Sequence, residues 1–503
     1  MQSELEALRA QLSELQGEKQ MLEQQNALLK QRIRDLERCI FARRSEKYID
    51  HPELPFPGDE PEPEPPPYVD EAPDDEERNT DPKGRKRRRR GVSRVAAELP
   101  RVREVVEPSA NEAHCPEGCE RQVIGEEVTE KLEYNPASFY IREIVRPKYA
   151  CRAHEEHGVA TSALPAMPIP KGMAGPSLLA QVCTAKYKDH LPLHRQHGIY
   201  LRHGVDIAES TMVDWVRECA ALLAPVVAAT KVALLSRDIV HTDDTPICVL
   251  EPGKRRSQGS RRGFLWAYLG DPGEVVFDFT EARSRDGPRA FFGDYEGYVQ
   301  ADAFPGYNIL FVPGSGRIEV GCWAHSRRRY CKALDTEPDH AKPAIAAIRG
   351  LYQVEALADE QGMDPGARLQ LRLQQSKPAL ESFRKWLEEV RKLVLPKSPM
   401  GKAIDYTLRQ WGPLTAFLQD GRLKLDNNRC ERAIRQVAVG RKNWMFAGSA
   451  AGAERAATIY SVIGGCIELR VDPLEYLGDV LQRIAEGEDP ARLTPVAWKL
   501  ARG

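Results

Sequence analysis

Leucine recurs every seven residues through the first forty positions of the chain. Counted from Leu5, the second core position of this heptad is leucine five times, and the first core position carries one amide, Asn26. Leucines at the second position with a single buried asparagine at the first are typical of a parallel two-stranded coiled coil. The pattern therefore predicts a dimerisation helix over residues 1–48. The alternative is a single helix that packs on the body of the protein itself.

The spacing of apolar residues changes further along the chain. Residues 170–235 have helical spacing, with Ser210 and Thr211 as the expected cap before Met212. Short runs rich in β-branched and aromatic residues follow, separated by Gly, Pro or Asp: RDIVHTDD, FLWAYLGD, EVVFDFT, GYVQADAF and RIEVGCW. Residues 324–420 and 426–488 return to helical spacing. Strands followed by a crossover and helices predict an α/β or α+β domain with helices around one sheet.

Length, charge and cysteine content restrict the class of protein. A chain of 503 residues is too long for one core, which predicts two to four domains. No run of 18 apolar residues is present and the N-terminus is polar, so we expect neither a membrane span nor a secretory signal. The 11 cysteines are scattered and odd in number, which is typical of reduced thiols. These features predict a cytoplasmic protein.

The near balance of 72 basic and 74 acidic residues hides a local asymmetry. Residues 51–82 contain ten prolines, twelve acidic residues and a single arginine, a composition that predicts an unfolded linker. The linker leads directly into KGRKRRRR, residues 83–90. We expect this run, including Arg85, Lys86, Arg87 and Arg88, to contact nucleic-acid phosphates. The alternative is that it rests against the acidic linker.

Four cysteine and histidine residues have the spacing of a metal site. Cys115 and Cys119 form a C-x3-C pair, and Cys151 with His154 forms a C-x2-H pair further along. Two such pairs around a β-like segment predict one structural, tetrahedral zinc ion. His114 or His157 are alternatives for the fourth ligand. The alternative is that these cysteines are free and buried, without a metal.

Three acidic positions stand out among the elements expected after residue 236. Asp243, followed by Asp244, ends the run DIVHTDD, Asp302 ends GYVQAD, and Glu431 lies in the helical stretch LKLDNNRCERAIR. Carboxylates at the ends of apolar strands are costly unless they are paired or bind a metal. Oxygen ligands favour Mg²⁺ or Mn²⁺, and two such ions support phosphoryl transfer. Ordinary surface or capping acids are the alternative that spacing alone leaves open.

Eight further stretches of the chain are distinctive, in the order FARRSEKY, EKLEYNPASFYIREIVRPKYAC, HTDDTPICVL, QADAFPGYN, GCWAHSRRRY, DNNRCERAIR, RKNWMFAGSAAGAERAATIYSVI and DPLEYLGDVL. Taken together, they resemble the large transposase of the insertion sequence 66 family over nearly its whole length. The resemblance implies a ribonuclease-H-like core with a DDE triad at Asp243, Asp302 and Glu431, interrupted by a helical insertion. The chain departs from the family in reading DDT where the family tends to have Asp-Glu-Thr. It also departs in both expected zinc pairs, which in the family are usually Cys-x-x-Cys.

The resemblance also gives roles to residues around the expected triad. His325 is expected to orient a catalytic group or contact the scissile phosphate, although a single histidine is more often structural. Cys322 and His325 have C-x2-H spacing, but no second pair is near in sequence, so no metal is expected there. Expected DNA contacts are Arg328, Arg441, Lys442 and Trp444, with the core as the alternative for Trp444. Asn427, Asn428, Arg432 and Arg435 are expected either to approach DNA phosphates or to hold Glu431 in position.

The expected organisation follows the same order along the chain. It comprises a coiled-coil dimerisation helix (1–48), an acidic linker with the basic run (49–95), a zinc-binding domain (96–165), a helical DNA-binding or connecting region (166–235), the first part of the catalytic core (236–330), a helical insertion (331–422), the second part of the core (423–488) and a C-terminal tail (489–503).

Two classes of function remain open at the level of sequence. The leading hypothesis is a dimeric DNA transposase with two Mg²⁺ or Mn²⁺ ions and one zinc ion. Its expected partners are element ends, target DNA and, by resemblance, two small accessory proteins of the same element. The alternative is a dimeric zinc-containing DNA-binding regulator without catalysis. Against the regulator, the basic run follows the coiled coil across a flexible linker instead of continuing its helix. A transposase fold without activity is a third possibility.

Overall fold

The structure is a computed structural model that describes residues 138–142, 144, 148–150, 159–161, 165–170, 172–251, 259–270 and 273–502. The expected coiled coil, the basic run with Arg85, Lys86, Arg87 and Arg88, and the expected zinc ligands Cys115, Cys119, Cys151 and His154 lie outside these residues. The described residues up to Ile144 belong to a separate unit of the chain and are exposed. All elements named below come after residue 145.

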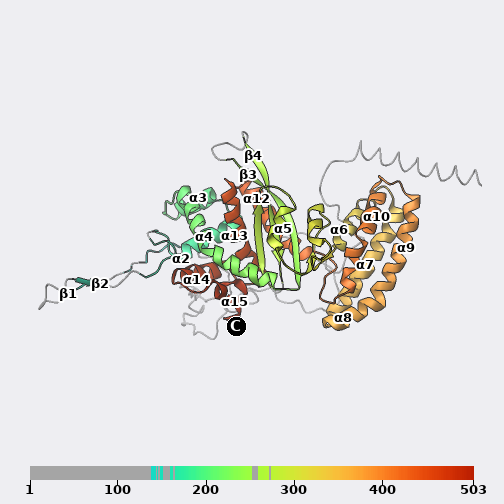
Figure 1. Cartoon of the computed structure of the whole chain (residues 1–503). Coiled ribbons are helices and arrows are strands. Elements are labelled where there is room, and N and C mark those ends of the chain that lie inside the picture. Colours follow the sequence, from blue (N-terminus) through green and yellow to red (C-terminus); the bar gives the residue numbers. More distant parts are fainter. Residues whose placement is uncertain are drawn as a thin grey trace, which may run out of the picture. The chain divides into compact units, whose positions relative to one another are not determined.

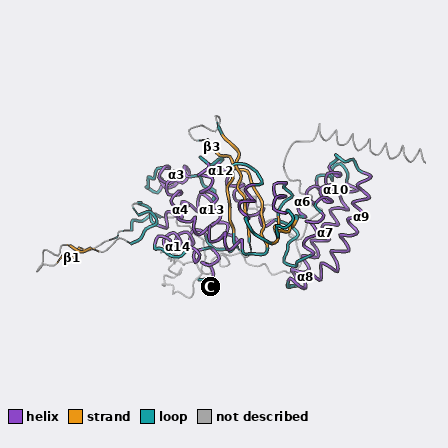
Figure 2. The backbone as a smooth tube through the Cα atoms, viewed as in Figure 1, coloured by secondary structure: helices purple, strands orange, loops and turns teal. Residues whose placement is uncertain are grey.

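One five-stranded mixed sheet forms the centre of this unit (Figure 2). Its strands are β3 (Ile239–Leu250), β4 (Ser260–Leu269), β5 (Val275–Thr280), β6 (Gly297–Gln300) and β7 (Arg317–Val320), in the order β5-β4-β3-β6-β7. The first three pair antiparallel, whereas β6 pairs parallel with β3, and β7 pairs parallel with β6. This is the strand order of a ribonuclease-H-like sheet, so the expected fold class is confirmed. A separate short hairpin pairs β1 (Lys148–Ala150) with β2 (Val159–Thr161).

The alternation of side chains along the strands gives the sheet two buried faces. Leu265, Ala267 and Phe277 lie in one core, whereas Trp266 and Tyr268, the residues between them, lie in another. Successive side chains of a strand point to opposite faces, so each face of the sheet has its own core. The apolar runs in the sequence are nearly continuous because both faces are covered by helices.

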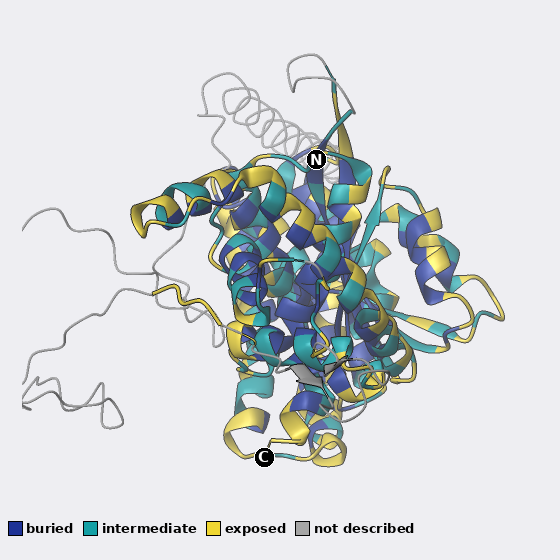
Figure 3. Cartoon of the chain, turned by 90° about the vertical axis from the view of Figure 1, so that its left-hand side faces the viewer, coloured by how far each residue is buried: buried dark blue, intermediate teal, exposed yellow. Residues whose placement is uncertain are grey.

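The larger of these two cores contains helices that come before the sheet in the sequence and helices that come after it. They are α2 (Pro176–Tyr187), α3 (Leu193–Arg202), α4 (Glu209–Leu235), α12 (Asn428–Trp444), α13 (Ala450–Glu468), α14 (Pro473–Ala485) and α15 (Pro495–Leu500). Helices α12 and α13 pack directly on the strands, and α4 packs on α13 (Figure 1). Buried residues fill the inside of this layer, while exposed residues lie on its outer faces (Figure 3).

Helix α4 is long and apolar enough to cross a membrane by length and composition alone, as judged over the described residues. About a third of its most apolar stretch is buried. Met212, Trp215 and Leu223 belong to the large core, whereas Leu234 belongs to the core on the opposite face. The expected cap at Ser210 and Thr211 is wrong. The helix begins at Glu209 after Ala208, without a side-chain cap, so both hydroxyl residues lie inside the first turn.

The opposite face of the sheet is covered by the short helix α5 (Asp286–Phe292) and the 3-10 helix η3 (Pro305–Phe311). Tyr268 of β4 stacks on Phe291 of α5, with ring centroids 3.5 Å apart, and Trp266 meets Tyr307 of η3 edge to face. Aromatic pairs of this kind stabilise by more than their buried area alone. They fix the segment that follows β6, which carries Asp302.

A helical insertion separates β7 from α12 and has a hydrophobic core of its own. Its elements are α6 (Trp323–Cys331), α7 (Pro338–Glu360), α8 (Pro365–Leu371), η4 (Arg372–Ser376), α9 (Lys377–Leu393), α10 (Pro399–Arg409), α11 (Trp411–Thr415) and η5 (Ala416–Leu418). The fully buried Arg372 pairs with Glu355 and donates to the carbonyl oxygens of Phe417 and Leu423. This arginine therefore joins the helices of the insertion to the segment that leads into α12.

The end of the chain differs from the expected tail. Residues Pro490–Leu493 form the 3-10 helix η6, and α15 follows it. Leu493 and Trp498 are buried in the large core, and Trp498 Nε1 donates to Asp479 of α14 at 2.8 Å. The last residues are thus part of the packed structure.

Candidate active site

The parallel pairing of β3 with β6 brings the two candidate aspartates to neighbouring positions. The pairing ends at His241 opposite Gln300, and Asp243 and Asp302 each lie two residues further along their own segment. Neighbouring strands are about 4.8 Å apart, and residues two apart share a face. The two carboxylates therefore share one region at the end of β6. Asp302 Oδ1 also accepts a hydrogen bond from the Phe304 amide at 3.1 Å, which fixes its side chain.

Helix α12 brings the third carboxylate to the same region. Glu431 lies in the first turn of α12, which packs on β3 and β4. The start of the helix is anchored by the fully buried Asn427. Its Nδ2 donates to the Thr242 carbonyl at 2.8 Å, and its Oδ1 accepts from His241 Nδ1 at 3.1 Å. One amide thus ties the first turn of α12 to the strand that carries Asp243.

The three carboxylates interact electrostatically. Burial, together with the negative charges of Asp302 and Glu431, raises the pKa of Asp243 to about 8, against a lowering hydrogen bond from the Asp244 amide. An ordinary aspartate has a pKa of about 4. At neutral pH the protein therefore favours the protonated, neutral form of Asp243. A cation close by would favour the charged carboxylate instead.

Arg283 supplies one positive charge beside these groups. Its guanidinium donates to both carboxylate oxygens of Asp244 at 2.7–2.9 Å and lies 3.8 Å from Asp302 Oδ2. It also lies over the ring of Phe304 at 3.8 Å from the ring centroid. Burial raises the pKa of Asp244, while the arginine opposes that shift. Asp244 is therefore engaged by Arg283, which leaves Asp243 to face Asp302 and Glu431.

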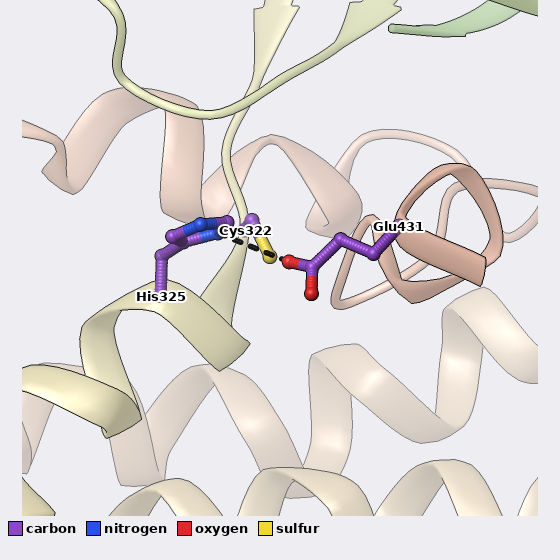
Figure 4. A group of neighbouring side chains, drawn as sticks. All are labelled: Cys322, His325 and Glu431. Carbon is purple, nitrogen blue, oxygen red and sulfur yellow. Dashed lines mark ion pairs between the residues drawn. The ribbon is translucent and has the colours of Figure 1, made fainter. Parts of the chain in front are cut away.

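Figure 4 shows a second group of side chains at Glu431, formed with Cys322 and His325. Their ligand atoms all lie within 4.8 Å of one another. His325 Nδ1 and Glu431 Oε1 are 3.6 Å apart, beyond hydrogen-bond distance, and both buried atoms are without a hydrogen bond in the described part of the chain. Burial lowers the pKa of His325, although the charge of Glu431 opposes this. Arg328 donates to the other oxygen of Glu431 at 3.2 Å.

The chemistry of these groups fits hard divalent cations at the three carboxylates. A buried carboxylate oxygen without a hydrogen bond, together with mutual repulsion among three acids, is a set of groups that a divalent cation would satisfy. Cys322 does not fit as a ligand of a hard cation, since Mg²⁺ and Mn²⁺ prefer oxygen ligands and its Sγ accepts a hydrogen bond from the Asn427 amide. The set is therefore suited to Mg²⁺ or Mn²⁺.

The residues expected to contact DNA have different surroundings. Arg432, Arg435 and Lys442 lie on α12 with exposed side chains, and Arg328 is exposed beside Glu431. Arg441 donates to Thr245 Oγ1 and to the Pro246 carbonyl of β3.

The two asparagines and Trp444 are buried or half-buried. Asn427 is fully buried, so DNA contact is wrong for it, and its other expected role, holding the Glu431 helix, remains. Asn428 Nδ2 donates to Asp426 at 3.0 Å. Trp444 is half-buried against the large core.

Sequence reasoning missed two residues of this site. Arg283 lies in the loop after β5, and no motif marks it; its role depends on where Asp244 and Asp302 meet in space. Cys322 was considered only as a zinc-type ligand, whereas its sulfur accepts the Asn427 amide.

Comparison with protein-family models gives three matches along the chain. Residues 171–455 match the model described as "Transposase IS66 family", which covers more than half of the chain. Residues 112–153 match "zinc-finger binding domain of transposase IS66", and residues 28–103 match "Transposase C of IS166 homeodomain". The zinc-finger match includes Cys115, Cys119 and Cys151, while His154 lies one residue beyond it.

Several relatives come from Sinorhizobium fredii (strain NBRC 101917 / NGR234). Uncharacterized protein y4hP is 32% identical over 80% of this chain and 76% of its own length. Uncharacterized protein y4qI is 35% identical over 81% and 76%, and uncharacterized protein y4jD is 30% identical over 83% and 84%. The family match spans both parts of the sheet-bearing core and the helical insertion between them. The chain therefore belongs to the insertion sequence 66 family of transposases.

Proposed function

We propose that this transposase cleaves the ends of its insertion sequence and joins the freed 3′-hydroxyls to target DNA at Asp243, Asp302 and Glu431. The observation that carries the proposal is the convergence of these three carboxylates, which raises the pKa of Asp243 to about 8 through burial and the charges of the other two. Acids that repel one another in this way are typical of sites that bind cations.

Asp243, Asp302 and Glu431 would hold two Mg²⁺ or Mn²⁺ ions, which activate an attacking oxygen and stabilise the leaving oxygen of an in-line displacement. In the cleavage step a water oxygen bonds to phosphorus and the 3′-oxygen of the element leaves with a proton. In the joining step that 3′-hydroxyl attacks a target phosphate, and the target's own 3′-oxygen leaves. The same three carboxylates serve both steps.

The surrounding residues would position the carboxylates and the DNA. Arg283 holds Asp244 and neighbours Asp302, so it keeps the loop after β6 in place. Asn427 fixes the first turn of α12, and therefore Glu431, against β3. The exposed Arg432 and Arg435 continue along the same helix and would bind backbone phosphates. His325, with a lowered pKa, would be neutral beside Glu431 and able to take up a proton at Nδ1.

The remaining expectations complete the proposal at the level of the assembly. Two subunits would pair through the N-terminal coiled coil so that two element ends are held together. One zinc ion would be bound within residues 112–154, and two small accessory proteins of the element would take part. The protein would act in the cytoplasm.

The experiment is divalent-metal-dependent nicking of element-end DNA by the purified full chain. We expect wild type to nick in Mg²⁺ and the variants Asp243→Ala, Asp302→Ala and Glu431→Gln to lose activity by about 10³-fold or more. Arg384→Gln, an exposed change in the insertion, is the matched control and should nick as wild type does. Full nicking by any of the three site variants would remove that residue from the triad. Binding of DNA without nicking by wild type would favour the regulator.

A further inference from the structure

A pocket with a volume of about 340 Å³ lies on the helical side of the sheet, apart from the three carboxylates. Its aromatic lining consists of Tyr187, Trp444 and Phe446, and Ile247 of β3 contributes to its apolar wall. Val213, another lining residue, is half exposed, so the pocket opens to solvent. The volume is in the range of small-molecule sites.

The wall that carries the aromatic residues has a strained backbone. Helix α12 ends at Trp444, and Met445 follows with φ of 61°. The chain then pairs with the outer part of β3, where Ala447 donates to the Cys248 carbonyl and accepts from the Leu250 amide. A non-glycine residue with positive φ is costly and occurs preferentially at ligand sites. The strain places Trp444 and Phe446 on the same pocket.

Positive charge surrounds the opening of this pocket. Lys186 and Arg455 both line it, and within the described residues neither forms an ion pair with a carboxylate. Lys186 Nζ lies 5.4 Å from the ring centroid of Tyr187. The N-terminus of α13 also borders the pocket through Ser449 and Gly452, and Ser449 Oγ caps it by accepting the Gly452 amide. The two cations, beside the partial positive charge of this helix start, favour a phosphate at this edge.

Polar atoms without partners lie behind the aromatic wall. Trp444 Nε1, Tyr460 Oη and His190 Nδ1 are buried and make no hydrogen bond among the described residues. All three lie within about 3 Å of the point that a side chain on Gly440 would occupy, at 2.7, 2.9 and 3.1 Å. Buried polar groups in native proteins rarely remain unpaired. The N–H edge of the indole therefore faces Tyr460 and His190 behind the pocket wall.

Sequence distance along two elements relates the pocket to the carboxylates. Ile247 is four residues from Asp243 on β3, about 13 Å for an extended strand. Trp444 is thirteen residues from Glu431 on α12, about 20 Å for a helix. The pocket is thus a few nucleotides of DNA from the proposed site of cleavage.

We propose that this pocket receives one unpaired nucleotide of the DNA strand that lies in the active site. The base packs against Trp444, Tyr187 and Phe446, and its phosphate lies on Lys186, Arg455 and the N-terminus of α13. Aromatic side chains bind unpaired bases of any sequence by stacking, and the cations bind the backbone. The assignment deepens the proposed function and rests on it, since it takes the strand at the active site as the occupant.

The first test is ultraviolet crosslinking of the full chain to a single-stranded oligonucleotide that carries one 5-iodo-2′-deoxyuridine. Mass spectrometry of the crosslinked peptides is expected to place the main crosslink on Trp444, Phe446 or Tyr187. Crosslinks confined to aromatic residues outside the pocket would overturn the proposal. A millimolar excess of thymidine monophosphate should leave the crosslink largely intact, whereas its complete loss would mean a site for free nucleotides and would overturn the assignment to a strand.

Variants separate the pocket from general DNA affinity. Trp444→Ala is expected to lower the crosslink yield about tenfold, and Lys186→Gln and Arg455→Gln about fivefold each. Because Trp444 also packs on the core, Val213→Phe, which fills the half-exposed opening, is a second variant and should lower the yield similarly. Arg384→Gln, exposed on α9, should not change it. Unchanged yields in Lys186→Gln, Arg455→Gln and Val213→Phe together would refute the pocket.

One further variant distinguishes failure of the pocket from failure of the proposed function. Asp243→Asn is expected to crosslink as wild type does and to nick no DNA. If it nicks normally, the proposed active site is wrong, although a crosslink at Trp444 would still identify the nucleotide pocket. If wild type nicks in Mg²⁺ but does not crosslink there, the pocket is wrong and the active site stands.

Discussion

At Asp243 the fold favours the neutral acid, whereas the proposed metal binding needs the charged carboxylate. Its carboxylate is largely removed from water and faces the charges of Asp302 and Glu431, so its pKa is raised to about 8. A folded-state pKa above the unfolded value means that the folded protein holds the proton more tightly. The stability associated with that proton is complete below about pH 4 and is lost as the pH rises through 8.

Replacing Asp243 by Asn removes this pH dependence. Asparagine stays neutral and its Oδ1 can still accept the Asp244 amide. We expect the metal-free variant to match wild type near pH 4 and to exceed it increasingly up to about pH 8, by about 5 kcal/mol in the free energy of unfolding. Urea denaturation at several pH values with a chelator measures this. In Mg²⁺ the order should reverse, because wild type alone is stabilised by binding. An equal pH profile for both proteins would contradict the raised pKa.

The three acids were predictable from the apolar patterns around them, although Asp243 lies within β3, which continues to Leu250, and does not end its strand as the sequence suggested. The neighbouring asparagines were not, since Asn427 and Asn428 look alike in sequence. The structure separates them: Asn427 is fully buried between β3 and Cys322, whereas Asn428 pairs locally with Asp426. Arg283 was not predictable either, because its loop becomes part of the site only when β6 places Asp302 beside it.

Helix α12 is the element that unites the proposed site and the pocket. Its first turn carries Glu431, its middle carries the exposed Arg432 and Arg435, and its last residue is Trp444. The helix holds its angle to the sheet through the amide of Asn427 at one end and Arg441 at the other, which donates to Thr245 and Pro246 of β3. Both ends of α12 are therefore fixed to the strand that carries Asp243.

Removal of the Asn427 side-chain amide is expected to loosen the contact between the first turn of α12 and β3. Asn427→Ala leaves the Thr242 carbonyl without this donor in a buried site, which costs about 1–3 kcal/mol of stability. It should also lower nicking at least tenfold, because Glu431 loses its anchor. Thermal unfolding and nicking rates measure the two effects. Asn428→Ala, at the next position, is the matched control with a loss below about 1 kcal/mol. Similar losses in both variants would mean that the buried amide has no special role.

At this scale the sequence predicts most of the fold. The strands follow from β-branched and aromatic runs that form β3 to β7, and the helical spacing of residues 170–235 forms α2, α3 and α4. The start of α4 was misjudged because Ser210 and Thr211 resemble a cap, but the chain already becomes helical at Glu209. The end of the chain was misjudged because a helix as short as α15 carries too few residues to show a period.

The described part of the molecule contains three hydrophobic cores, and further segments precede it in the chain. The sheet has one core on each face, and the helical insertion has a third. The expected coiled coil, linker and zinc-binding segment come before these parts in the chain and lie outside the described residues. The family match over residues 112–153 agrees with a zinc-binding segment there.

Zinc content provides a test at this scale. Purified full chain is expected to contain about one equivalent of zinc, and the double variant Cys115→Ser, Cys119→Ser should lose it. Cys466→Ser, which changes a buried cysteine of α13, is the control and should keep the metal. Metal analysis after dialysis measures the difference. An unchanged zinc content in the double variant would show that these two thiols are not ligands.

Because of the insertion between β7 and α12, the three proposed site residues are not synthesised together at the ribosome. Asp243 and Asp302 emerge with the sheet, but Glu431 follows Asp302 by 129 positions. At ordinary rates of translation this delay is on the order of ten seconds. A product that stops within the insertion would carry all five strands but neither Glu431 nor the helices α12 and α13 that pack on them, so under the proposed function it would be unable to cut DNA.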